Sequence, residues 1–264
     1  MGVIAVTGSA SGIGAATRAR LVGDGHRVVG VDLRDAEVVA DLGSVDGRQV
    51  AIDGVTATCG GALDGLVTCA GLGGLPDRSG ALLVSVNYFG TVELLAALRP
   101  LLARGSDAAA VAISSNSATC QPNWPTEIAD ACLAGDEPLA RSLSEDAGAL
   151  QAYPAAKAAI ARWVRRNAVA ADWVGAGIRL NAVAPGMVET PLTAEMRRDP
   201  LVGPALEMFP IPSGRPGRPE EIADLIAFLL GPQAAFFIGS VVLVDGGTEA
   251  QLRPDDWPAV WSLG

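Results

Sequence analysis

The stretch TGSASGIG at residues 7–14 follows the apolar run Val3–Val6 and leads into a segment of helical periodicity. Three of its glycines are spaced as G-x3-G-x-G. Because glycine has no side chain, the backbone N–H groups of such a loop can approach a pyrophosphate, whose charge then faces a helix N-terminus. An ordinary turn would explain one or two glycines, but not three between a strand and a helix. The stretch therefore predicts a dinucleotide-binding loop whose contacts are Gly8, Ser11, Gly12, Ile13 and Gly14.

Six more apolar runs follow, and most are continuous and rich in Val and Ile, which is typical of strands buried on both faces. They are Val28–Val31, Val38–Leu42, Leu66–Cys69, Ala110–Ile113, Ile178–Val183 and Val241–Val244. Segments of helical periodicity lie between most of them, namely Ile13–Val22, Val92–Leu102, Ala155–Trp173 and Glu220–Leu230. This alternation predicts an α/β fold, in which residues 1–264 form a single doubly wound, Rossmann-like domain. It would have about seven parallel strands, with helices on both faces.

Three segments fit this alternation less simply. The link Leu33–Glu37 is too short for a crossover helix, so Val50–Ile52 competes with Val38–Leu42 for the third strand. Residues 118–150 are polar, acidic and interrupted by prolines, and residues 187–219 are also rich in proline. Both follow predicted strands, so we expect both to project from the carboxyl edge of the sheet, where ligands bind in this architecture.

Composition excludes several classes of function. The formal net charge of −10 disfavours a nucleic-acid partner. A single histidine, His26, and four cysteines without a CxxC pair argue against a metal site, and no G-x-S-x-G motif supports a Ser-His-Asp hydrolase. We find neither a basic segment before the first apolar run nor an apolar run long enough to span a bilayer. We therefore expect no signal peptide, no membrane partner and a reducing cytoplasmic location.

Asp32 ends the second predicted strand, eighteen residues after Gly14. A carboxylate at this position can accept hydrogen bonds from both hydroxyls of an adenosine ribose and would repel a 2′-phosphate. Arg34 is the one nearby feature that favours a phosphorylated cofactor. Because Asp32 outweighs Arg34, we predict NAD as the cofactor. The alternative is that Asp32 is a solvent-exposed loop residue.

Lys157 is the only lysine in the chain and lies four residues after Tyr153, one of two tyrosines. This spacing puts both side chains on one face of a helix, and Pro154 predicts that the helix begins close to Tyr153. An ammonium beside a phenol lowers the pKa of the tyrosine from about 10. Such a tyrosine can exchange a proton with an alcohol oxygen while hydride moves to or from a nicotinamide. A lysine left on the surface is the alternative interpretation.

Six motifs in this order resemble the short-chain dehydrogenase/reductase family in its single-domain form, from Val3 to about Gly247. They are TGSASGIG, CAG at residues 69–71, SVNYFG with Asn87, ISS at residues 113–115, YPAAK at residues 153–157 and APGMVETPL at residues 184–192. The resemblance implies Tyr153 as acid/base, Lys157 as the residue that lowers its pKa and binds the nicotinamide ribose, Ser115 as the group that orients the substrate oxygen, and Asn87 as the holder of a proton-relay water. It also implies cofactor contacts from Asp41, Leu42, Cys69, Ala70, Gly71, Pro185, Gly186, Val188 and Thr190.

The chain departs from the family pattern at three points. Cys69 replaces the usual asparagine, Ala156 replaces a small hydroxyl residue, and 38 residues separate Ser115 from Tyr153. The long separation marks residues 118–150 as an insertion beside the site and puts the usual tetramer in doubt. We still expect a homo-oligomer, either a dimer or a tetramer.

The insertion, CAGLG, SVNYFG and LRPDDW at residues 252–257 resemble the branch of the family that holds the bacterial 3α-hydroxysteroid dehydrogenase/carbonyl reductases. This likeness implies a steroid or other apolar carbonyl substrate for an NAD(H)-dependent interconversion of a secondary alcohol and a ketone. The residues expected to wall its pocket are Trp124, Leu133, Leu143, Met187, Leu192, Met196 and Phe209. The alternatives are a short-chain alcohol, sugar or β-ketoacyl reductase, and a non-catalytic NAD-sensing protein.

Overall fold

A parallel sheet of seven strands forms the centre of the computed structural model, which describes residues 2–256. The strands are β1 (Val3–Thr7), β2 (Arg27–Asp32), β3 (Val38–Val39), β4 (Gly65–Thr68), β5 (Ala109–Ile113), β6 (Arg179–Pro185) and β7 (Val241–Val244). Their order in the sheet is β3-β2-β1-β4-β5-β6-β7, and every pair is parallel. The predicted single α/β domain with seven strands is confirmed.

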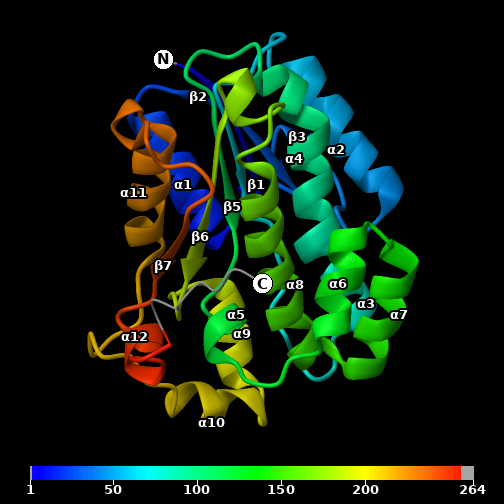
Figure 1. The fold of residues 1–264 in the computed structure, drawn as a ribbon, viewed down its shortest axis with the longest axis vertical. Helices are drawn as coiled ribbons and strands as arrows, with labels where there is room; N and C mark the ends of the chain where they lie inside the picture. Colours follow the sequence, from blue (N-terminus) through cyan, green and yellow to red (C-terminus); the bar gives the residue numbers. More distant parts are fainter. Residues whose placement is uncertain (1, 257–264) are drawn as a thin grey trace, which may run out of the picture.

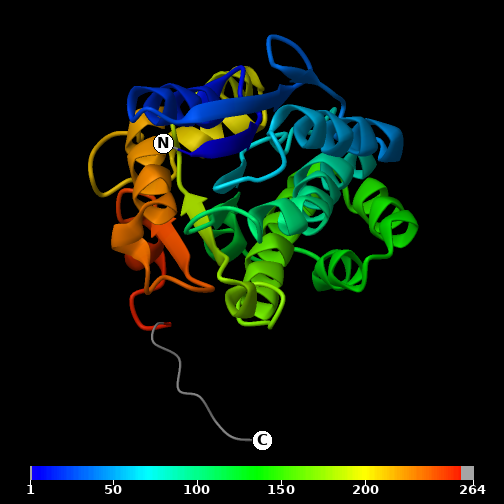
Figure 2. The same cartoon turned by 90° about the horizontal axis from the view of Figure 1, so that it is seen from above.

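Helices cover both faces of the sheet (Figures 1 and 2). One face carries α1 (Gly12–Gly23) and α11 (Pro219–Leu230), which pack against each other, and the other carries α2 (Val45–Thr58), α4 (Gly90–Leu102) and α8 (Ala149–Asn167). Two separate hydrophobic cores fill the spaces between the sheet and its two helical layers. The strands are therefore buried on both faces, as their continuous apolar runs predicted.

The third strand is shorter than predicted. It covers only Val38–Val39, while Val50–Ile52, the competing segment, lies inside α2. Val39 pairs with Asp32, the last residue of β2, so the residues after Val39 have no further partner in β2. Before β3, the carboxylate of Glu37 accepts a hydrogen bond from the N–H of Gly30 in β2 at 2.8 Å. Glu37 also pairs with Arg18 at 2.5 Å, so a side chain covers the edge of β2 that β3 does not reach.

The longest helical segment runs without a break from α3 (Gly80–Val84) through the π-helical turn η1 (Ser85–Phe89) into α4. It has 23 residues and contains an 18-residue window with a mean hydropathy of 1.6, so it is long and apolar enough to span a bilayer. The expectation that no apolar segment reaches that length is therefore wrong, because it placed the start of the helix at Val92 and missed its first turns. Two thirds of its apolar window is buried inside the protein, where it forms part of the core.

Helix α8 also begins earlier than predicted. It starts at Ala149, so Pro154 lies inside the helix instead of in its first turn. Proline lacks the N–H that would bond the carbonyl of Leu150, but the side chain of Gln121 donates to that carbonyl at 3.0 Å. This contact from outside the helix explains why proline does not set its start.

The two irregular segments contain short helices. Residues 118–150 include the end of α5 (Ser117–Cys120), then α6 (Thr126–Ala134), which packs on α8, and α7 (Glu137–Ala147), which packs on α3. Residues 187–219 include α9 (Pro191–Arg198) and α10 (Val202–Glu207), which lie beyond the carboxyl ends of the strands (Figure 1). The short elements η2 (Val174–Ala176), η3 (Pro232–Ala234) and α12 (Thr248–Leu252) complete the fold. Trp257, the last residue of the LRPDDW motif, lies outside the described residues.

Candidate active site

The glycine loop between β1 and α1 has the backbone that its spacing predicted. Gly8 and Gly12 adopt positive φ angles of 66° and 53°. A Cβ at Gly14 would lie 2.1 Å from the carbonyl oxygen of Gly8, so this close approach of helix and strand requires glycine. The N–H of Gly8 donates to Val31 in β2 at 2.8 Å, which fixes the loop over the ends of both strands.

A cavity of about 400 Å³ runs from this loop along the carboxyl edge of the sheet. Every residue predicted to contact the cofactor lines it, namely Gly8, Ser11, Gly12, Ile13, Gly14, Asp32, Asp41, Leu42, Cys69, Ala70, Gly71, Tyr153, Lys157, Pro185, Gly186, Val188 and Thr190. The positive-φ glycines, the N-terminus of the 12-residue helix α1 and this lining fit a dinucleotide.

Asp32 is held at the adenosine end of this cavity by its neighbours. One carboxylate oxygen accepts from the N–H of Ala10 at 2.9 Å and the other from that of Leu33 at 2.7 Å. The side chain of Arg34 is 85% exposed and lies beside Asp35, while the nearby Arg18 is paired with Glu37. The arrangement therefore favours ribose hydroxyls over a 2′-phosphate at Asp32.

Tyr153, Lys157 and Ser115 meet where β5 and α8 come together. The residue Lys157 is only 4% exposed, and its Nζ donates to the carbonyl of Ile113 at 2.9 Å. The same Nζ lies 5.9 Å from the centre of the Tyr153 ring. Burial lowers the pKa of Lys157 to about 8, so the ammonium is the main form at neutral pH.

The role of Lys157 in lowering the pKa of Tyr153 stays a prediction. Burial raises the pKa of the phenol above its usual range, and hydrogen bonding to Ser115 is the influence that lowers it. Lys157 directs its ammonium to the Ile113 carbonyl. Tyr153 is therefore a neutral phenol at neutral pH, which suits a proton donor.

Asn87 lies in the π-helical turn η1 and is fully buried. Its side-chain oxygen accepts from the N–H of Leu72 at 2.7 Å, and its nitrogen donates to the carbonyl of the same residue at 2.9 Å. Asn87 does not line the cofactor cavity, although it lies directly behind Gly71, which does. It supports the turn after β4, and its role in holding a water remains a prediction.

Sequence reasoning missed Ser114 and Ile113 as supports of Lys157. The Ser114 hydroxyl donates to the backbone carbonyl of Lys157 at 2.8 Å, while Ile113 accepts from its ammonium. The ISS motif was assigned to Ser115 alone. The available signal was the second adjacent serine, because successive side chains at a strand end point in opposite directions.

A second cavity of about 420 Å³ opens next to the first, and both are lined by Ser115 and Tyr153. Met187, Leu192, Met196 and Phe209 line it, as predicted. The prediction for Trp124, Leu133 and Leu143 is wrong, because they do not line it and pack against the core instead. The insertion contributes Cys120, Gln121, Pro122 and Leu150 to the wall.

Known proteins are similar to this chain in both sequence and fold. Residues 2–126 match the family model described as short chain dehydrogenase, and residues 145–249 match the one described as enoyl-(acyl carrier protein) reductase. The 3-alpha-hydroxysteroid dehydrogenase/carbonyl reductase of Comamonas testosteroni is 45% identical over 96% of this chain and 99% of its own length. The chain belongs to the short-chain dehydrogenase/reductase family. It is an oxidoreductase of that family.

Two further relatives extend the comparison within the short-chain dehydrogenase/reductase family. The cis-4-hydroxycyclohexanecarboxylate dehydrogenase of Sinomonas cyclohexanicum is 34% identical over 94% of this chain and 96% of its own. The crystal structure of the 3-alpha-hydroxysteroid dehydrogenase from Pseudomonas sp. B-0831 complexed with NADH has a TM-score of 0.91 and 48% identity, covering 96% of this chain and 99% of that one. The two family matches leave out residues 127–144, which hold most of α6 and all but the last turn of α7.

Proposed function

We propose that the protein is an NAD(H)-dependent dehydrogenase that interconverts a secondary alcohol and a ketone on an apolar, alicyclic substrate such as a 3α-hydroxysteroid. The observation that carries this proposal is the junction of two cavities at Ser115 and Tyr153. The first cavity has the lining expected for a dinucleotide, and the second is walled mainly by apolar side chains. A reacting carbon at the junction can face both a nicotinamide and the phenol.

The residues at the junction have distinct roles in this mechanism. Bound NAD(H) supplies the hydride chemistry and would be held by the glycine loop, Asp32 and Lys157. Ser115 orients the substrate oxygen by hydrogen bonding. Tyr153 gives that oxygen a proton during ketone reduction and takes it back during alcohol oxidation. Lys157 keeps a positive charge near the phenol, which favours the phenolate left after proton transfer.

The substrate class rests on the second cavity and on the named relatives. Its volume of about 420 Å³ lies in the range that holds drug-sized ligands. Both the Comamonas and the Sinomonas relatives bear names that place a hydroxyl group on an aliphatic ring system. The Pseudomonas relative was crystallised as a complex with NADH, which agrees with Asp32 as the ribose-binding carboxylate.

Replacement of Tyr153 with phenylalanine tests the mechanism. We expect Y153F to lose at least about a hundredfold in the rate of ketosteroid reduction, because phenylalanine cannot donate the proton. NADH binding, measured by fluorescence titration, should stay within a few-fold of wild type. The assay includes cyclohexanone derivatives and short ketones as comparison substrates. A Y153F enzyme that retains substantial turnover would contradict the assignment.

We also propose that the protein is a cytoplasmic homodimer. The four cysteines are free thiols, which fits a reducing compartment. Helices α6 and α7 cover α8 and α3, the helices beside the insertion, and so leave less of that face for a tetramer contact. Exposed apolar side chains instead gather near β7 and α11, where Phe228, Phe236, Phe237 and Leu243 lie. A two-fold dimer would bury them.

A further inference from the structure

The first turns of α8 contain a proline directly after the proposed acid/base. Pro154 is the sixth residue of the helix, so its missing N–H would have bonded the carbonyl of Leu150. Such a carbonyl in a helix needs another donor, or the helix bends at that point. The phenol of Tyr153 extends from this same part of the helix.

Gln121 supplies the missing donor. Its side-chain Nε2 donates to the Leu150 carbonyl at 3.0 Å, although 29 residues separate the two in sequence. The backbone of Gln121 is fixed in turn, because its N–H donates to Ser117 at 3.1 Å at the end of α5. Helix α5 follows Ser115 after a single residue. Gln121 therefore links the strand end that holds Ser115 to the helical turn that holds Tyr153.

Gly74 packs tightly against this turn. A Cβ added at Gly74 would lie 2.9 Å from the carbonyl oxygen of Ala149 and 3.2 Å from the Cβ of Tyr153. Contacts from both Gly74 and Gln121 therefore restrict this turn. A shift of its backbone would move the phenol relative to Ser115, and proton transfer is sensitive to such displacements.

We propose that Gln121 is a positioning residue for Tyr153, in which a side-chain amide replaces the helical hydrogen bond that Pro154 removes. This inference rests on the proposed role of Tyr153. It assigns the first loop of the insertion a part in catalysis that does not require contact with substrate.

A double-mutant cycle with Q121L and P154A tests the proposal. Q121L keeps a side chain of similar size but removes the donor, and kcat for ketone reduction at saturating substrate should fall about tenfold. The KM for NADH should not change. P154A restores a backbone N–H to Leu150, so P154A and the double variant Q121L/P154A should both reach kcat values within about twofold of wild type.

The rescue separates positioning from direct contact, since an alanine at position 154 cannot replace a substrate contact made by Gln121. Wild-type kcat in Q121L, or an equal loss in Q121L/P154A, would overturn the proposal. Melting temperatures of all variants show whether they are folded, and a kcat loss in folded Q121L that P154A reverses supports it. Y153F is assayed in parallel, because an active Y153F would instead refute the proposed function.

Discussion

Lys157 is buried, and its protonation should control the rate of ketone reduction. It is buried and charged at neutral pH, and its pKa is lowered to about 8 by burial. The ammonium supports proton transfer from Tyr153, whereas neutral Lys157 would not. We therefore expect kcat/KM for NADH in ketone reduction, which reports groups of the free enzyme, to fall about tenfold per unit of pH above 8. A rate that stays constant to pH 9.5 would exclude Lys157 as the group responsible.

The same shift predicts how stability changes with pH. Because the pKa is 10.5 in the reference state and about 8 in the folded protein, the unfolded chain binds more protons between these values. The free energy of unfolding should therefore increase as pH rises from 8 to 10.5, and this increase is lost as pH falls back through 8. Urea unfolding of wild type and K157M at pH 7 and 9.5 isolates this contribution as a difference between the two proteins.

Sequence alone predicted the residues whose roles depend on local spacing. The glycines of residues 7–14, Asp32 and the Tyr153–Lys157 pair all line the cofactor cavity, since strand ends and helix faces fix where they point. Ser114 and Gln121 could not be found in this way. Their partners lie 43 and 29 residues away, and only tertiary packing brings them together.

At the scale of elements, a buried ion cluster joins the insertion to the rest of the protein. The side chain of Arg48 in α2 is 1% exposed and bonds Glu93 of α4 at 2.6 Å and Glu137 of α7 at 2.5 Å. Arg48 also contacts the carbonyl of Leu42, which lines the cofactor cavity, at 3.4 Å. Glu137 further accepts from the hydroxyl of Ser85 in η1 at 2.7 Å. One carboxylate of α7 therefore supports both the cofactor cavity and the π-helical turn.

Removal of this carboxylate should destabilise the protein. We expect E137A to lower the free energy of unfolding by about 2–3 kcal/mol, because the buried Arg48 loses one of its two carboxylate partners. KM for NADH should rise as the support of Leu42 weakens. The control is D130A, because the side chain of Asp130 on α6 is 71% exposed, and it should stay within about 0.5 kcal/mol of wild type. Urea unfolding that gives equal values for E137A and D130A would contradict the role of the cluster.

Element boundaries were predictable where hydrophobic runs define them. They were not predictable where they depend on contacts with another segment of the chain. Six of the seven strands lie within one or two residues of their apolar runs. The third strand is short because β2 ends at Asp32, the partner of Val39, and α8 extends ahead of Pro154, where Gln121 supplies the donor that proline lacks. The second exception involves a single side-chain hydrogen bond to a backbone group.

At the scale of the whole molecule, the fold was predictable, whereas the packing of the insertion was not. Alternation of apolar strands with helices implies a doubly wound sheet, regardless of the length and structure of the loops. The apolar residues of the insertion, in contrast, show only that its helices have a buried face. Trp124, Leu133 and Leu143 were expected to wall the substrate cavity but pack against the core. Sequence spacing does not tell which neighbouring surface covers such a face.

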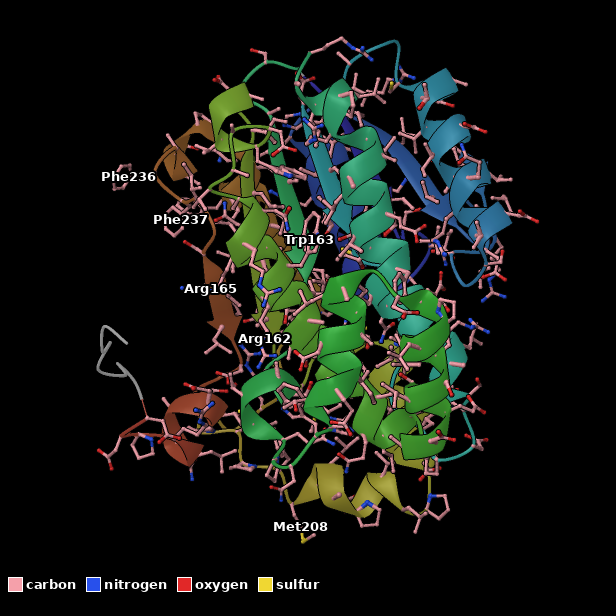
Figure 3. The ribbon with its side chains drawn as sticks, turned by 45° about the vertical axis from the view of Figure 1, so that its right-hand side comes forward. Arg162, Trp163, Arg165, Met208, Phe236 and Phe237 are labelled. Carbon is pink, nitrogen blue, oxygen red and sulfur yellow. The ribbon has the colours of Figure 1, made fainter. Side chains whose placement is uncertain are left out.

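The proposed dimer gives the last prediction. Phe236 is fully exposed, and Phe237 stacks edge-on against Phe228 with ring centres 5.6 Å apart. Figure 3 shows Phe236 and Phe237 together at one edge of the molecule, on the side of α8 that carries Arg165, and Met208 at another edge. Burial of one phenylalanine is worth about 1.5–3 kcal/mol, and a two-fold interface buries each residue twice.

We therefore expect sedimentation velocity to show a wild-type dimer and a monomeric F236S/F237S variant at micromolar concentration. M208S, which also removes an exposed apolar side chain, should remain dimeric, because Met208 lies on the separate edge (Figure 3). The active site lies at the carboxyl edge of the sheet within one chain, so the monomeric variant should keep most of its kcat. A monomeric wild type, or a variant that still dimerises, would show that this surface is not the interface.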